Sequence, residues 1–420
     1  MRHVILGNGP AGVVAAETLR KLAPSDDVVV VGAEPGRPYS RMAIPYLLSG
    51  KIDEAGTLLR KDPDHFQRLR VSLRHGRATK VDTAGRTVTL DDGTALPWDR
   101  LLVATGSVPV RPPIPGIDLP GVESCWTLED ARRIAARARP GARVVQMGAG
   151  FIGCIIMEAL HARGAKLTVV EMGDRMVPRM MGPRAGGLIR QWVEKKGVAV
   201  RTSARVDGIV AKGGALEVHL ASGERFPAEL VVSATGVKPS AAFLAGSGIQ
   251  VERGIRADAS CQTNVPGVYA AGDCAEAFDN LTGTYFVSAI QPNAVDQAAC
   301  AATNMAGGKA LMRAVTPINV LDTLGLVSAS FGRWEGVPGG QRAEVSDPRR
   351  FRYLHLEFDG DVLVGANVIG QTEHVGVLRG LVEQKIRLGR WKDHLLREPT
   401  RLTEAYLATA QRQEAWAVLH

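Results

Sequence analysis

The residues from Val4 to Gly12, VILGNGPAG, limit what this chain can fold into more than any other stretch. A short apolar run ends at Gly7, and Gly9 and Gly12 complete a G-x-G-x-x-G spacing in front of a segment rich in helix formers. In such a loop the first glycine permits a tight turn, the second lets the backbone approach a pyrophosphate, and the third lets helix pack on strand. The helix N-terminus then faces the negative charge of the phosphates. We therefore expect a dinucleotide-binding unit at the start of the chain.

A second apolar run, VVVVGAE, supports this interpretation. It ends in Glu34, about 20 residues beyond the last glycine, where a carboxylate typically accepts hydrogen bonds from ribose hydroxyls. We expect Glu34 to bind the nucleotide together with the loop residues Pro10 and Ala11.

The whole pattern returns in ARVVQMGAGFIGCIIMEALHARGAKLTVVEM. The second copy consists of the glycines Gly148, Gly150 and Gly153, the intervening Phe151 and Ile152, and the carboxylate Glu171. Each copy is followed by a strand that ends in Ala-Thr-Gly, first Ala104-Thr105-Gly106 and then Ala234-Thr235-Gly236. An ordered duplication is much harder to obtain by chance than one motif, so two dinucleotide sites are predicted.

Further strands and helices are predicted around these copies. Residues 71–99 have the alternation and turn signals of an antiparallel meander. A strand over Val268 to Ala271 leads to Gly272 and Asp273, whose carboxylate would point into a cofactor crevice or cap a helix. From residue 316 the pattern becomes α+β, and residues 402–419 suggest an amphipathic helix.

Composition argues against several other classes of protein. No run of eighteen apolar residues occurs and the N-terminus begins with a strand, so we expect a cytoplasmic protein without a membrane span. The five cysteines are scattered, which disfavours a disulfide framework or a metal site. The net charge of +8 is dispersed and aromatic residues make up only 5%, so nucleic-acid binding is not expected. His3, His65 and His161 are expected at the surface or in caps rather than in catalysis.

Both glycine loops, both Ala-Thr-Gly strands and the Gly-Asp strand, in this order, resemble the FAD-dependent pyridine nucleotide-disulfide oxidoreductase superfamily. The resemblance covers roughly residues 1–385. It implies an α/β fold with two Rossmann-like domains, as in glutathione reductase, and a C-terminal α+β interface domain. The implied domains are FAD-binding over 1–112 and 236–312, NAD(H)-binding over 113–235, and C-terminal over 313–420 with an added terminal helix.

The resemblance also assigns ligands to these residues. For FAD they are Gly7, Gly9, Pro10, Ala11, Gly12, Glu34, Arg41, Ala104, Thr105, Gly106, Gly272 and Asp273. For the nicotinamide nucleotide they are Gly148, Gly150, Phe151, Ile152, Gly153, Glu171 and Gly236. The Glu171 carboxylate would repel a 2'-phosphate and so favours NADH, although Arg175 leaves NADPH open.

The loop after Glu34 departs from the disulfide reductases. No C-x-x-x-x-C pair is present, and Met42 stands where single-cysteine relatives carry their nucleophile. A thioether forms neither a thiolate nor a sulfenic acid, so thiol chemistry would need Cys154 or another cysteine brought in by the fold. Residues 38–41, PYSR, are similar to the P-Y-x-R loop of rubredoxin and ferredoxin reductases and of the flavin part of nitrite reductases. The catalytic residues stay unknown, and Arg41, Met42 and Tyr46 are candidates to neighbour the flavin.

We therefore expect an FAD-dependent NAD(P)H oxidoreductase that passes a hydride from NADH to FAD and then electrons to an external acceptor. The expected acceptor is a ferredoxin, a rubredoxin or an iron–sulfur subunit, in a homodimer or a hetero-complex. An NADH oxidase, a disulfide or persulfide reductase, and an NADH-responsive binding or assembly flavoprotein remain alternatives. A run of basic residues would dock an acidic carrier or form a solvated helix face: Lys385, Arg387, Arg390, Lys392, Arg397 and Arg401.

Overall fold

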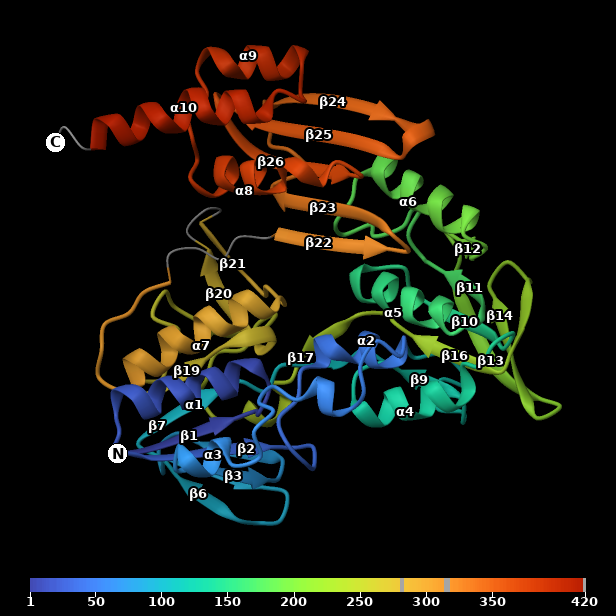
Figure 1. Ribbon diagram of the computed structural model, residues 1–420. Helices are drawn as coiled ribbons and strands as arrows, with labels where there is room; N and C mark the ends of the chain where they lie inside the picture. The colour runs from blue at the N-terminus through green and yellow to red at the C-terminus, as the bar shows by residue number, and fades with distance from the viewer. Residues whose placement is uncertain (280–282, 313–317, 418–420) are drawn as a thin grey trace. The chain divides into compact units, whose positions relative to one another are not determined.

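The computed structural model describes residues 1–279, 283–312 and 318–417 (Figure 1). Contacts divide the chain into two compact units. Unit 1 comprises Met1–Val110, Trp126–Leu128 and Val237–Val315, and unit 2 comprises the rest of the chain. The boundaries between three domains, as the resemblance implies them, stay a prediction.

Unit 1 is built on a parallel sheet of five strands in the order β19-β7-β1-β2-β3. These strands are β1 (Arg2–Leu6), β2 (Asp27–Gly32), β3 (Val71–His75), β7 (Arg100–Val103) and β19 (Val268–Ala270). The central strands are almost continuously apolar because both faces of the sheet are covered. Helices α1 (Pro10–Leu22) and α7 (Gln291–Met305) pack side by side on one face, blue and gold in Figure 1.

The prediction of an antiparallel meander over residues 71–99 is wrong for the first strand of that segment, β3 (Val71–His75). β3 pairs in parallel with β2, with Val71 beside Val28, and forms the edge of the main sheet. Only Val71 of this edge strand is buried, and the alternation of apolar and polar residues in its sequence imitates a hairpin strand. Only β4 (Ala78–Asp82), β5 (Thr87–Leu90) and β6 (Ala95–Pro97) form the antiparallel sheet.

Smaller elements complete unit 1. Strands β8 (Ser107–Pro109) and β17 (Val237–Pro239) pair with each other, and β18 (Ile255–Ala257), β20 (Ala275–Asp279) and β21 (Thr284–Phe286) form a three-stranded sheet. Short helices are η1 (Arg41–Ala43), α2 (Ile44–Leu48), η2 (Ala55–Thr57), α3 (His65–Arg68), η3 (Ala242–Leu244) and η4 (Gly272–Cys274).

His3 was predicted to lie at the surface or in a cap, and this prediction is wrong. The residue is fully buried in β1. Its Nε2 lies 2.8 Å from Asp26 Oδ2. A histidine is tolerated there because this carboxylate supplies a partner for one ring nitrogen.

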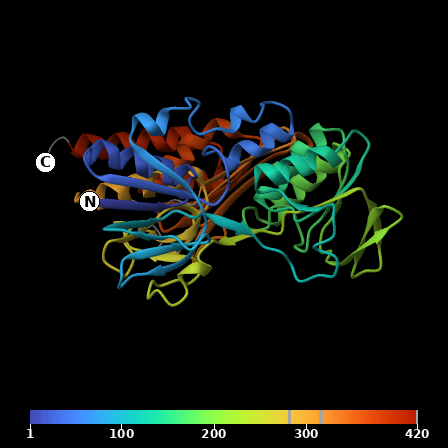
Figure 2. The same cartoon turned by 90° about the horizontal axis from the view of Figure 1, so that it is seen from below.

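Unit 2 repeats the architecture of unit 1. Its parallel sheet has the order β12-β11-β10-β16-β9. The strands are β9 (Val122–Ser124), β10 (Arg143–Met147), β11 (Lys166–Val170), β12 (Ala199–Arg201) and β16 (Leu230–Ser233). Helices α4 (Leu128–Arg137), α5 (Phe151–Ala162) and α6 (Pro183–Lys195) accompany it. Strands β13 (Val206–Lys212), β14 (Ala215–Leu220) and β15 (Arg225–Ala228) form a separate small sheet, yellow-green in Figure 2. The predicted duplication is therefore a repeat of fold as well as of sequence.

The rest of unit 2 is an antiparallel sheet in the order β22-β23-β26-β25-β24. Its strands are β22 (Ile318–Thr323), β23 (Leu326–Gly332), β24 (Gln341–Asp347), β25 (Arg352–Asp359) and β26 (Val362–Ile369). Short helices η5 (Pro348–Arg350) and η6 (Thr372–His374) lie in its connections. Helices α8 (Val375–Glu383), α9 (Arg390–Arg397) and α10 (Leu402–Ala417) follow, and Leu402 and Ala405 of α10 are buried in the core of this sheet. The α/β fold with a C-terminal α+β part is confirmed.

No helix of the described residues is both long enough and apolar enough to cross a lipid bilayer.

Candidate functional site

The first glycine loop is closed so tightly that side chains are excluded from it. Gly7, at the end of β1, has φ +113°, and a Cβ there would lie 2.1 Å from the carbonyl oxygen of Ala104. A Cβ on Gly12 would lie 1.9 Å from the carbonyl oxygen of Gly7. Strand, loop and helix thus meet the Ala-Thr-Gly strand at distances that only glycine allows.

Gly9, in contrast, faces open space. A Cβ there would meet no atom of the described residues within 4 Å. Gly9 is the N-cap of α1, and within the described residues the helix start has neither a side-chain cap nor an acidic residue in its first turn. The first backbone N–H groups of the helix and its positive dipole end are therefore available to an anion. This geometry fits the pyrophosphate of a dinucleotide.

The second loop has the same construction. A Cβ on Gly148 would lie 2.4 Å from the carbonyl oxygen of Ala234, and one on Gly153 would lie 2.5 Å from that of Gly148. Gly150 faces open space, and the start of α5 is likewise uncapped by any side chain of the described residues. Gln146, which the sequence analysis missed, donates from Nε2 to the carbonyl oxygens of Gly148 and Gly153, both at 2.9 Å. The fully buried amide fixes the shape of this loop.

Glu34 lies just after β2, at the centre of a small polar cluster in unit 1. It accepts hydrogen bonds of 2.6 Å from the Tyr39 hydroxyl and from the Arg41 guanidinium. Burial, assisted by the Glu34 carboxylate, raises the pKa of Tyr39 to about 12. The hydroxyl therefore stays protonated and remains a donor.

Arg41 connects this cluster to β8. Its second nitrogen donates to the carbonyl oxygen of Ser107 at 3.3 Å, and its guanidinium lies 5.2 Å from the ring centre of Trp126. The Trp126 indole donates to the same carbonyl oxygen at 2.9 Å. The sequence gives no periodicity or spacing that identifies Ser107 or Trp126, because both contacts depend on the tertiary structure.

Asp273 lies in the short helix η4, which follows the end of β19. Its carboxylate accepts a 2.9 Å hydrogen bond from Ser107 Oγ, and burial raises its pKa from the ordinary value. The preceding Gly272 donates its backbone N–H to Gln297 Oε1 at 2.8 Å. The structure thus brings Arg41 and Asp273 together around Ser107, although they are far apart in the sequence.

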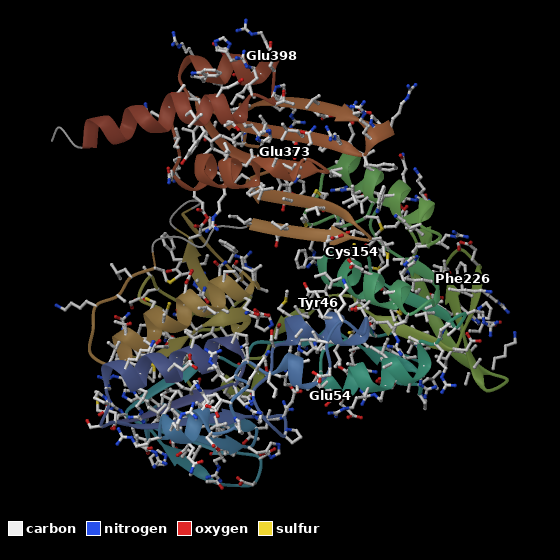
Figure 3. The ribbon with its side chains drawn as sticks, viewed as in Figure 1. Tyr46, Glu54, Cys154, Phe226, Glu373 and Glu398 are labelled. Carbon is white, nitrogen blue, oxygen red and sulfur yellow. The ribbon has the colours of Figure 1, made fainter. Side chains whose placement is uncertain are left out.

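Met42 and Tyr46 are exposed, with 52% and 54% of their surfaces accessible. Tyr46 projects from α2, as Figure 3 shows, and Lys51 Nζ lies 5.8 Å from its ring centre. Both candidates are thus accessible side chains in the segment that follows Glu34.

Glu171, after β11, is held by the backbone. Its carboxylate oxygens accept hydrogen bonds from the N–H groups of Ala149 and Gly173, each at 2.7 Å. Arg175 donates to the carbonyl oxygens of Met181 at 2.8 Å and Pro178 at 3.3 Å, and to Asp174 at 2.7 Å. All three nitrogens of the Arg175 guanidinium are thus engaged in hydrogen bonds within the protein. The Glu171 carboxylate lies against the second glycine loop.

All five cysteines fall in the described part of the chain, and all are buried free thiols. Cys154 lies in α5 (Figure 3), and burial raises its pKa to about 12, as it does for Cys125. Neither thiol is a thiolate at neutral pH, which is the form that chemistry requires. No group of three or more metal-ligating side chains was found among the described residues.

Comparison with known proteins agrees with this geometry. The family model of the pyridine nucleotide-disulphide oxidoreductases matches residues 1–302. The NADH-dependent phenylglyoxylate dehydrogenase subunit epsilon of Aromatoleum evansii is 31% identical, over 95% of each chain. The NADH oxidase of Methanocaldococcus jannaschii is 30% identical, over 88% of each chain. The crystal structure of a ferredoxin reductase from Rhodopseudomonas palustris is 26% identical with a TM-score of 0.84, covering 91% of this chain and 94% of its own.

Proposed function

The chain belongs to the pyridine nucleotide-disulphide oxidoreductase family, and we propose that it transfers electrons from NADH through FAD to an iron–sulfur acceptor protein. Members of this family are FAD-dependent NAD(P)H oxidoreductases, so the proposal concerns the nucleotide, the residues and the acceptor. The observation that carries it is the pair of uncapped glycine loops, each with a carboxylate at the end of its second strand.

We assign FAD to unit 1 and the nicotinamide nucleotide to the first part of unit 2. Gly9 and the start of α1 would hold the pyrophosphate of FAD, Glu34 its ribose, and Asp273 its polyol chain. Gly150 and the start of α5 would hold the pyrophosphate of the second nucleotide. The predicted FAD-binding domain, residues 1–112 and 236–312, and the NAD(H)-binding domain, residues 113–235, form part of this proposal.

We propose NADH rather than NADPH as the donor. The fixed Glu171 carboxylate has lone pairs left for ribose hydroxyls and would repel a 2'-phosphate. Arg175, the cation that left NADPH open, already donates to two carbonyl groups and to Asp174. A 2'-phosphate would therefore gain no free guanidinium at this position.

When bound, FAD supplies the hydride and electron chemistry, and the protein positions it. Arg41 would fix the Glu34 carboxylate on one side and the Ser107 carbonyl on the other. Ser107 in turn fixes Asp273 through its hydroxyl. No general base is required of the chain, and the exposed Met42 and Tyr46 would shield the flavin rather than react with it.

An iron–sulfur protein is the acceptor we favour, either a ferredoxin or rubredoxin or a subunit of a larger enzyme. Two of the similar proteins point this way, since one is named as a subunit of an NADH-dependent dehydrogenase and another as a ferredoxin reductase. A homodimer or a hetero-complex, and a cytoplasmic location where NADH is supplied, belong to the same proposal. The alternative of a disulfide or persulfide reductase lacks support from the buried Cys154.

Anaerobic titration of the flavin spectrum with NADH, followed by addition of acceptors, tests the proposal. We expect bleaching with NADH at lower concentration than with NADPH, and rapid reoxidation by a ferredoxin or rubredoxin. Rapid reoxidation by oxygen alone would instead indicate the NADH oxidase. A long-lived reduced complex that no acceptor reoxidises would indicate the NADH-responsive binding protein, and a protein that cannot be loaded with flavin would overturn the proposal altogether.

A further inference from the structure

Two of the buried cysteines, distant in the sequence, meet in the core of unit 1. Cys261 lies in the loop between β18 and β19, and Cys300 lies in α7. Both side chains belong to the hydrophobic cluster beneath α1 and α7. Neither takes part in the proposed electron transfer.

The loop of Cys261 is fastened to the helix of Cys300 by neighbouring contacts. Asn304, one turn after Cys300, donates from Nδ2 to the Ser260 carbonyl oxygen at 2.8 Å. Cys300 Sγ lies 3.8 Å from the carbonyl oxygen of Ala259 and 3.8 Å from Asn304 Nδ2. The two residues that precede Cys261 are thus held against Cys300 and Asn304 before any bond forms between the sulfurs.

The backbone at Cys261 is held in an uncommon conformation. Its φ is +61°, in the left-handed region that residues other than glycine rarely adopt. Such a conformation persists only where the surrounding structure determines it, and it frequently accompanies a functional constraint. Here the hydrogen bonds from Cys261 N to Asp258 and from Ala270 N to the Cys261 carbonyl oxygen fix it.

The two thiols differ in acidity and exposure. The neighbouring Cys261 thiol lowers the pKa of Cys300, and the Cys300 thiol, together with burial, raises the pKa of Cys261. Cys300 is 7% exposed and Cys261 is 2% exposed, so Cys300 is the more accessible of the two buried thiols. A more acidic, more accessible thiol beside a protonated partner is the arrangement of an attacking and a resolving cysteine.

We propose that Cys261 and Cys300 are a peroxide-sensitive pair that closes to an intramolecular disulfide and reopens on reduction by a thiol. In the first step the Cys300 thiolate attacks hydrogen peroxide, the O–O bond breaks, and a sulfenic acid and hydroxide form, the hydroxide taking a proton to become water. In the second step the Cys261 thiol loses its proton and attacks the sulfenic sulfur. The S–S bond forms as the S–O bond breaks, and the leaving hydroxide takes that proton to give a second water molecule.

The disulfide would link the loop before β19 to α7, close to the turn that holds Asp273. Gln297, one turn before Cys300, accepts the backbone N–H of Gly272, the first residue of η4 after β19. Both ends of the covalent link would thus brace the turn that presents Asp273. Closing the loop between Cys261 and Cys300 also restricts the unfolded chain, so oxidised unit 1 should unfold at a higher temperature.

The test uses the full-length flavin-loaded protein treated with hydrogen peroxide, with untreated protein alongside. No Lys or Arg lies between Arg256 and Lys309, so a tryptic peptide contains Cys261, Cys274 and Cys300 together. Digestion before aspartate residues separates them, because Asp273 and Asp296 lie between the cysteines. We expect a cross-linked pair of peptides carrying Cys261 and Cys300, lost on reduction, and an intact mass lower by two hydrogen atoms.

Matched variants make the result decisive. Cys300→Ala and Cys261→Ala should each abolish the cross-link, and Cys125→Ala, a buried cysteine of unit 2, should leave it unchanged. The peroxide-treated protein should unfold at a higher temperature than the same protein after reduction, with no difference for Cys300→Ala. Cysteines that remain free, that oxidise only to sulfinic acid, or that pair with Cys274 or between chains would overturn the proposal.

Discussion

Glu171 accepts a 2.7 Å hydrogen bond from the backbone N–H of Ala149, the residue between the first two glycines of the second loop. A second bond of 2.7 Å, from Gly173, holds the other oxygen of the carboxylate. The charged group is thus fixed before any nucleotide arrives, so little side-chain entropy would be lost on binding.

We predict that Glu171→Gln raises the KM for NADH by about tenfold to a hundredfold. Hydrogen bonds to a charged group contribute about 1.5–3 kcal/mol, and the amide nitrogen would also oppose one of the two backbone N–H groups. The discrimination against NADPH should fall at the same time because the repelling charge is gone. Steady-state kinetics with both nucleotides measures the two effects.

Glu194→Gln is the matched control for this change. Glu194 pairs with Arg190 on the surface of α6, where an exposed ion pair contributes little. An unchanged KM for NADH in Glu171→Gln, equal to that of the control, would contradict the assignment of the second loop to NADH.

Gly150→Ala should block nucleotide binding without damaging the fold. A Cβ at Gly150 meets no described atom within 4 Å, so the thermal midpoint should stay within a few degrees of the parent value. The added methyl group would occupy the space where the backbone approaches a pyrophosphate, so the KM for NADH should rise at least about tenfold.

Gly187→Ala provides the control for Gly150→Ala. Gly187 also has open space around it but lies within α6, where alanine should stabilise the helix by about 0.5–1 kcal/mol. Its KM for NADH should not change. If Gly150→Ala keeps the parent KM while flavin content is normal, the nucleotide does not lie on this loop.

We predict that Arg41→Ala weakens the retention of FAD. The change removes the 2.6 Å bond to Glu34 and the contact with the Ser107 carbonyl, so the carboxylate and Asp273 lose their common support. Flavin released on dilution, followed by its fluorescence, should increase several-fold. Arg37→Ala, which removes an exposed arginine bonded to the backbone of Arg60, should retain flavin as the parent does. Equal release from both variants would exclude a role for Arg41 in the flavin site.

The sequence alone predicted those features that depend on local contacts between neighbouring elements. Gly12 and Gly153 follow from contacts between a helix and its own strand, and Gly7 and Gly148 occupy equivalent places against Ala104 and Ala234. The repeated strand order of the two parallel sheets was likewise implied by the duplication.

Other features depend on contacts that no local pattern encodes. Ser107 and Trp126 belong to the site because segments distant in the sequence lie together in the fold. Gln146 has no distinguishing signal in the sequence, and its role is evident only from the hydrogen bonds of its amide to two glycine carbonyl groups. β3 was misassigned because the edge of a parallel sheet and a hairpin strand give similar alternation. The pairing of Cys261 with Cys300 follows from the packing of α7, so the spacing of the cysteines could not predict it.

His3 should make the stability of unit 1 depend on pH. Burial lowers its pKa from the ordinary 6.5, although Asp26 opposes the shift, and no described atom bonds to Nδ1. Below pH 6.5 the unfolded chain therefore binds more protons than the folded one, so stability falls as pH decreases, with a slope of at most about 1.4 kcal/mol per pH unit. Urea unfolding between about pH 5.5 and 8 should show this slope, and His3→Gln should flatten it. His161→Gln, which keeps His3, should preserve it, and an equal slope in all three proteins would refute the assignment.

We predict that basic residues at the start of α9 dock the electron acceptor. Arg401 is already paired with Glu398 and Glu404, whereas Arg387, just before α9, and Arg390, its first residue, are exposed. If they dock an acidic iron–sulfur protein, the double change Arg387→Glu and Arg390→Glu should lower kcat/KM for that protein at least about tenfold at low salt, because like charges then oppose the encounter. The effect should shrink as salt screens the charges, and reduction of a neutral quinone should not change.

The same double change made at Arg349 and Arg350, which are exposed in η5, controls for net charge. Equal losses for both double variants would mean that overall charge steers the acceptor, and no loss in either would place the docking site elsewhere.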